Sequence, residues 1–194
     1  MDQDTQRQPS ASILQALAKL FRADAHDRHV YCVFGPYERL WPFQKRLRKQ
    51  VAQGSFNERG LVHYLSLNRE IVEHMKSKGS YDHAVGLARR RMDVEFRQIL
   101  SESFRDLVTS RIEAKDTLGL VLADFELLYA YDLGNHDIPI ARQVAINGKR
   151  VCLLVPGQMR DRRLWIFDDD PESRCEFPDA LVFKNSGWVF ELAD

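Results

Sequence analysis

The sequence has few cysteines, and none at a spacing that would hold a metal. Cys32, Cys152 and Cys175 lie far apart in the chain of 194 residues. No CxxC pair occurs and no Cys/His ligand spacing is present, so a structural zinc site is not expected. The number is odd, and Cys32 and Cys152 lie inside apolar runs, where cysteine acts as a small hydrophobe. This usage favours a reducing compartment, and we expect a cytoplasmic protein.

The chain also lacks an excess of charge and a long apolar run. Lys and Arg (28) balance Asp and Glu (28), so no global field draws the protein to nucleic acid or an anionic membrane. No run approaches the roughly 20 apolar residues that span a bilayer. The polar N-terminus has no apolar segment typical of a signal peptide. We expect residues 1–10 to be disordered and residues 11–194 to form a single domain, with no membrane contact and no sequence-specific nucleic acid binding.

What the sequence does contain is an alternation of helix and strand patterns. Apolar residues at helical spacing predict helices near residues 13–21, 38–53, 68–78, 80–112 (with a break near Ser101 or Thr109) and 137–146. Apolar and β-branched runs predict strands at residues 29–34, 61–67, 118–123, 151–155, 164–167 and 187–192. The alternation predicts a three-layer α/β domain, with a mainly parallel sheet flanked by helices.

One candidate site follows the first predicted strand, where Gly35 opens a turn that starts like a phosphate loop. In the GxxxxGK[ST] spacing, a working loop needs glycine at Leu40, lysine at Trp41 and serine or threonine at Pro42. All three are absent, so a bound phosphate would lose its charge partner and part of its backbone cradle. The pattern favours a structural turn, and a degenerate nucleotide site is the alternative.

A second candidate is the acidic end of the strand at residues 118–123, which carries Asp124 and Glu126. It resembles a Walker B strand end, where one acidic residue holds Mg²⁺ and another polarises water. Without the lysine loop we expect no catalysis, and we expect Asp124 to cap the helical segment after it. In the alternative, the degenerate nucleotide site consists of Gly35, Asp124 and Glu126.

A third candidate is the polar stretch that contains Tyr129, Tyr131 and residues 135–137. His136 beside Asp137 could form an acid/base pair, but no serine or cysteine nucleophile is placed by a recognisable elbow. We interpret the stretch as a surface loop. The chain is accordingly predicted not to be an enzyme and to use neither a cofactor nor a metal.

Aromatic and basic residues in and after the first turn suit a protein interface, because aromatic and arginine side chains are where binding energy usually concentrates. The predicted partner-binding residues are Tyr37, Arg39, Trp41, Arg46 and Arg48. In the alternative interpretation, Trp41 packs beneath its own helix and the basic cluster is a solvated face.

The order of elements resembles that of BrxB, an accessory protein family of the BREX phage-defence systems, from about residue 12 onward. The matching segments are Tyr31–Glu38, Tyr64–Met75, Leu120–Tyr131 and Arg150–Gly157, followed by Arg163–Phe167. Residues 126–129 also resemble the "ELLF" segment of BrxF, a P-loop relative. The resemblance implies a P-loop-NTPase-like core with a degenerate phosphate loop. It further implies a non-catalytic scaffold that docks on a PglZ-type subunit. The alternative is an ATP- or GTP-binding switch with a non-standard loop.

Overall fold

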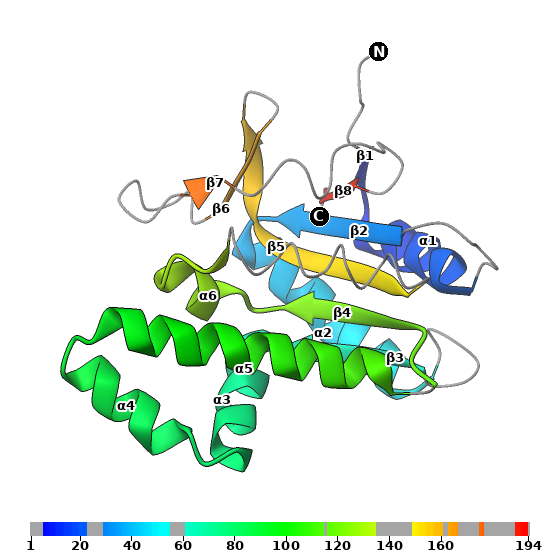
Figure 1. Cartoon of the computed structure of the whole chain (residues 1–194). Coiled ribbons are helices and arrows are strands. Elements are labelled where there is room, and N and C mark those ends of the chain that lie inside the picture. Colours follow the sequence, from blue (N-terminus) through cyan, green and yellow to red (C-terminus); the bar gives the residue numbers. More distant parts are fainter. Residues whose placement is uncertain are drawn as a thin grey trace.

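The structure is a computed structural model that describes residues 6–22, 29–54, 61–114, 116–134, 149–160, 163–166, 175–176 and 189–193 (Figure 1). The helices are α1 (Ser10–Arg22), α2 (Tyr37–Ala52), α3 (Leu67–Ser77), α4 (Tyr81–Arg89), α5 (Asp93–Glu113) and α6 (Glu126–Ala130). The strands are β1 (Gln6–Gln8), β2 (His29–Gly35), β3 (Val62–Ser66), β4 (Gly119–Ala123), β5 (Arg150–Arg160), β6 (Arg163–Ile166), β7 (Cys175–Glu176) and β8 (Val189–Leu192). The predicted helix at residues 137–146 lies outside the described part of the chain.

A parallel sheet forms the centre of the fold, with the strand order β1-β8-β2-β5-β4-β3. The last part of β5 leaves this sheet and pairs antiparallel with β6, which pairs in turn with β7. The prediction of a mainly parallel sheet flanked by helices is confirmed (Figure 1). The sheet ends at β3, which in the described residues pairs with β4 alone.

Helices cover both faces of the sheet because the central strands are apolar on both faces. Tyr31 and Val33 of β2 face the helices α1 and α2, whereas Cys32 and Phe34 face the opposite layer, which includes α3, α5 and α6. This is the pattern expected of a parallel sheet whose crossovers place helices on each side. Among the described residues, no helix combines the length and the apolar character needed to cross a bilayer.

The long helical segment breaks at a different place from the one predicted. α4 ends at Arg89 and α5 begins at Asp93, so the prediction of a break near Ser101 or Thr109 is wrong. Arg91 adopts a left-handed conformation (φ 55°), and the amide of Met92 donates to the carbonyl of Leu87. These are the features of a Schellman ending, which satisfies the last carbonyls of α4 and turns the chain back.

The strand β5 is also longer than predicted, because it does not stop at Pro156. Pro156 pairs with Gly35 of β2, and Gly157 pairs with Ile166 of β6, so one strand belongs to both sheets. At Gly157 a Cβ would lie 2.3 Å from the backbone oxygen of Trp165. Only glycine therefore allows β5 and β6 to approach this closely.

The prediction that residues 1–10 are disordered is wrong for the end of that segment. Gln6–Gln8 form β1, which pairs with β8, and α1 already starts at Ser10. The sequence of β1 is polar and gives no strand pattern, since the pairing with β8 is made by backbone groups and does not require apolar side chains.

Candidate functional site

The carboxyl ends of β2, β3 and β4 meet at one edge of the sheet, where ligands of parallel α/β folds usually bind. Strand β2 ends at Gly35 and helix α2 begins at Tyr37, so Pro36 alone lies between them. Leu40, Trp41 and Pro42 all lie inside α2. The segment with the phosphate-loop spacing is therefore helical from Tyr37 onward.

Asp124 lies directly after β4 and adopts a left-handed conformation (φ 59°), which aspartate tolerates better than most residues. Its side chain accepts a hydrogen bond from the hydroxyl of Ser66, at the end of the neighbouring strand β3. The prediction that Asp124 caps the next helix is wrong, since Phe125 holds that position in α6. The first turn of α6 is capped from a distance instead: the amide of Leu127 donates to Oδ1 of Asn68 (2.9 Å).

Both carboxylate oxygens of Glu126 accept hydrogen bonds. The Tyr37 hydroxyl donates to Oε1 (2.6 Å), and Nδ2 of Asn68 donates to Oε2 (2.7 Å). Burial, the hydrogen bond to Glu126 and the charges of Glu126 and Asp124 raise the pKa of Tyr37 well above its usual value. Glu126 thus joins the first turns of α2, α3 and α6. In the described residues, no group of three or more His, Cys, Asp or Glu side chains is arranged to hold a metal ion.

The aromatic residues of the third candidate pack inward. Tyr131 lies against Phe96 of α5, with ring centroids 4.5 Å apart. Burial raises the pKa of the Tyr129 hydroxyl well above its usual value. Residues 135–137, with the predicted His136–Asp137 pair, lie outside the described residues.

The predicted partner-binding residues divide between two flanks of α2. Tyr37, Trp41 and Arg48 follow one another at helical spacing, on the flank toward β3. Arg46 lies roughly 140° around the helix from Trp41, at 100° per residue. Arg39 shares that other flank and donates to the carbonyl of Leu192 in β8 (3.2 Å).

Trp41 is the most exposed aromatic side chain on α2. It is 58% exposed, so the alternative in which it packs beneath α2 is wrong. Nζ of Lys45 lies 3.4 Å from the centroid of its ring, a cation–π contact one helical turn along. We define the interaction flank of α2 as Tyr37, Trp41, Lys45 and Arg48.

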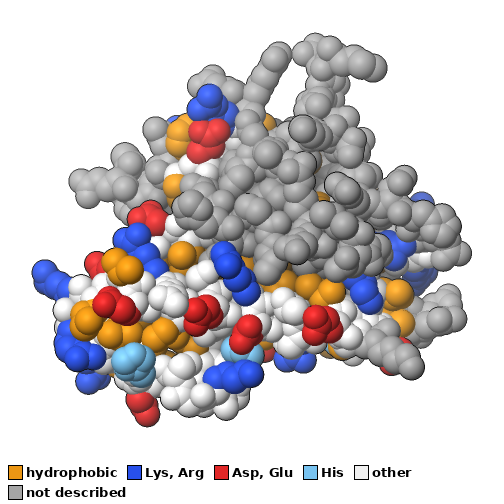
Figure 2. Space-filling model, viewed as in Figure 1, with side chains coloured by type: hydrophobic (Ala, Val, Ile, Leu, Met, Phe, Trp, Pro, Cys, Tyr) orange, Lys and Arg blue, Asp and Glu red, His pale blue; other side chains and the backbone are white. Residues whose placement is uncertain are grey.

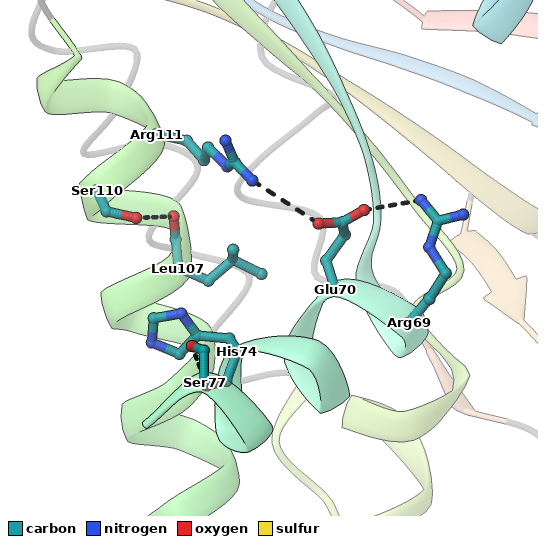
Figure 3. Close-up of polar contacts among 7 residues, drawn as sticks. All are labelled: Arg69, Glu70, His74, Ser77, Leu107, Ser110 and Arg111. Carbon is teal, nitrogen blue, oxygen red and sulfur yellow. Dashed lines mark hydrogen bonds and ion pairs between the residues drawn. The ribbon is translucent and has the colours of Figure 1, made fainter. Parts of the chain in front are cut away.

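A groove of about 380 Å³ lies at β3, the last strand of the sheet, and the sequence analysis did not predict it. It is lined by Arg48, Val51, Ala52 and Gly54 at the end of α2, by residues 62–65 of β3, and by Glu70 and Arg111 of α3 and α5. Burial and the charge of Arg111 lower the pKa of His63. Figure 3 shows Glu70 between Arg69 and Arg111, at 2.7 and 3.8 Å.

The charges over the face of α3, α4 and α5 are mixed in sign, as Figure 2 shows. Burial raises the pKa of Cys32, Cys152 and Cys175, which disfavours the thiolate form of each.

Comparisons with protein-family models, with curated proteins and with solved structures give no match to the chain.

Proposed function

We propose that the chain is a non-catalytic interaction subunit, which binds another protein through the interaction flank of α2. The observation that carries this proposal is the exposure of Trp41, at 58%, with Lys45 held over its ring. The surface of a globular protein rarely presents a tryptophan on the same helix flank as a tyrosine and two cationic side chains unless a partner covers them. Burial of such a side chain contributes about 2 kcal/mol to an interface.

The acidic residues support a scaffold in preference to a catalyst. Both oxygens of Glu126 already accept hydrogen bonds from Tyr37 and Asn68. Asp124 accepts a hydrogen bond from Ser66. These carboxylates tie elements of the fold together, and the proposed activity assigns no chemical step to them.

The partner we propose is the PglZ-type protein of a BREX phage-defence complex. The support for this assignment is the resemblance to BrxB, which is carried by Tyr31–Glu38, Tyr64–Met75, Leu120–Tyr131 and Arg150–Gly157. A gene neighbourhood containing a methyltransferase, a PglZ-like protein and a large ATPase would support the same system.

Co-expression with the cognate PglZ-type protein, followed by size-exclusion chromatography at micromolar concentration, tests the proposal. We expect one complex, which Trp41→Ala weakens at least tenfold. Arg48→Glu should weaken it in a salt-dependent manner. Arg46→Glu is the matched control, because Arg46 lies on the opposite flank of α2, and it should leave the complex intact. Separate elution of the two wild-type proteins would refute the proposed function.

The second candidate function is a nucleotide-binding switch with a non-standard phosphate loop. The observation that favours it is the Ser66–Asp124 pair, which lies at the carboxyl ends of two neighbouring parallel strands. In this alternative, Gly35, Asp124 and Glu126 would line the nucleotide site.

A further inference from the structure

The outer edge of β3 presents backbone groups that have no strand beside them in the described part of the chain. The amide of Leu118 donates to the carbonyl of Leu61, and the amide of Arg150 donates to the carbonyl of Leu118. Backbone groups alternate in direction along a strand, so this register turns the groups of His63 and Leu65 toward β4. The amide and carbonyl groups of Val62 and Tyr64 therefore point away from the sheet, into the groove.

Among the described residues that line the groove, positive charge exceeds negative charge. Arg48 of α2 lies on one wall and forms no ion pair in the described residues, while Arg111 of α5 lies on the other. Among the described residues of the lining, Glu70 is the acidic side chain, and it is shared between Arg111 and Arg69 (Figure 3). The pKa of His63 is lowered, so its imidazole is uncharged at neutral pH and adds nothing to this balance.

We infer that the β3 groove binds an extended acidic segment of the partner protein, which joins the sheet as an additional strand. The backbone of the segment bonds to the outward groups of Val62 and Tyr64. Its acidic side chains, which alternate between the two faces of the strand, reach Arg48 on one wall and Arg111 on the other. This is strand addition to an exposed sheet edge, in which the backbone supplies affinity and the side-chain pockets supply specificity.

The inference rests on the proposed function and states how part of the partner is held. Arg48 belongs both to the interaction flank of α2 and to the groove, so one partner can occupy the two surfaces together. A second copy of the chain fits the groove less well, because pairing two β3 edges would bring Arg48 and Arg111 of each copy together.

Two labelled synthetic peptides of eight residues serve as probes. The first combines valine with glutamate at both odd and even positions, and the second carries lysine in place of each glutamate. We expect fluorescence anisotropy to show binding of the glutamate peptide alone. Arg48→Glu and Arg111→Glu should each weaken it at least tenfold, and Arg46→Glu should leave it unchanged. Equal binding of the two peptides would overturn the inference.

Amide hydrogen exchange, followed by NMR, tests the strand geometry. The glutamate peptide should slow exchange at Val62 and Tyr64 at least tenfold and leave His63 and Leu65 unchanged, since the latter already face β4. N-methylation of alternate peptide amides should abolish binding in one register and not in the other. Binding that survives both methylation patterns would show that the backbone of β3 is not used. If exchange at the Val62 and Tyr64 amides is already slow in the free protein, another segment of the chain occupies the edge of β3. If exchange slows as the protein concentration rises, a second copy of the chain occupies it. Either result would overturn the inference.

The outcome is separable from that of the proposed function. Trp41→Ala should weaken the complex with the full partner and leave peptide binding unchanged, since Trp41 does not line the groove. If the full partner binds and exchange at Val62 and Tyr64 stays fast, the groove inference fails and the proposed function stands. If the peptide binds in the predicted way and the full PglZ-type protein does not, the partner assignment fails and the groove remains.

Discussion

At the scale of single residues, Leu40, Trp41 and Pro42 decide whether a nucleotide can bind after β2. Leu40 lies on the buried face of α2, and Pro42 has no amide N–H that could bind a phosphate. We predict negligible affinity for ATP or GTP in the presence of Mg²⁺, measured by isothermal titration calorimetry. Low-micromolar binding that Asp124→Asn weakens would contradict this prediction and favour the switch.

A second residue-scale prediction concerns Tyr31, which is fully buried. Burial raises its pKa to about 12, an effect that the nearby Arg150 partly offsets. An unfolded tyrosine ionises near pH 10. The folded state thus holds this proton more tightly, and the free energy of unfolding is unaffected below about pH 10 and falls as pH rises from there through about 12.

Urea unfolding followed by circular dichroism at pH 8, 9.5 and 11 measures this dependence. Tyr31→Phe should make the decline between pH 9.5 and 11 shallower, whatever its effect at pH 8. Tyr64 and Tyr129, whose pKa values burial also raises, keep part of the decline in that variant. A decline of unchanged steepness would show that Tyr31 does not contribute to it.

At the scale of elements, α5 shows what an apolar stripe can predict. Its spacing predicts Phe96, Ile99, Phe104 and Leu107 as core residues, and all except the half-buried Ile99 are buried against the sheet. The ending of α4 was not predictable in the same way, because arginine, unlike glycine or asparagine, does not indicate a left-handed conformation at position 91. Local patterns thus report which face of an element is apolar, and they say less about where a backbone turns.

Phe104→Ala should lower the free energy of unfolding by about 3–5 kcal/mol, as the loss of a fully buried ring leaves a cavity. Val94→Ala, on the same helix, is the matched control: Val94 is 77% exposed, and its loss should change stability by less than about 0.5 kcal/mol. Denaturant unfolding measures both. A Phe104 variant that melts within a degree or two of the parent would contradict the packing of α5.

The left-handed endings of α3 and α4 allow a reciprocal pair of substitutions. Gly79 ends α3 with φ 73°, and a Cβ there would meet nothing within 4 Å, so Gly79→Ala tests backbone strain alone. We expect a loss of about 1 kcal/mol. Arg91 ends α4 with φ 55°, and Arg91→Gly should give a gain of up to about 1 kcal/mol. If the midpoint temperatures of thermal unfolding of both variants shift in the same direction, this assignment is contradicted.

At the scale of the whole molecule, the order of strands creates the features that the sequence could not predict. Tyr37 reaches Glu126 across 89 positions of sequence, and Ser66 reaches Asp124 across 58. The groove exists because β3 is the last strand of the sheet, and no local pattern states which strand that is. Predicting it requires the pairing of strands, which depends on tertiary contacts.

The same order predicts a gradient of stability across the sheet. β2 pairs with β5 and β8, and β5 pairs with β2 and β4, so the innermost backbone amides open only with the whole fold. We expect native-state hydrogen exchange to be slowest at Val33 and Leu153 and fastest, within the parallel sheet, at Gln8 and Val62. Exchange as slow at Gln8 as at Val33 would contradict the strand order.

The close approach of β5 and β6 at Gly157 has an evolutionary consequence. A substitution that adds even one methyl group puts it 2.3 Å from the backbone oxygen of Trp165, and a backbone, unlike a side chain, cannot be exchanged for a smaller one. No other residue type is therefore tolerated at position 157 while β5 continues into the hairpin that it forms with β6. Lineages that keep the hairpin should retain this glycine through any amount of drift, and lineages that lose the hairpin should be free to replace it.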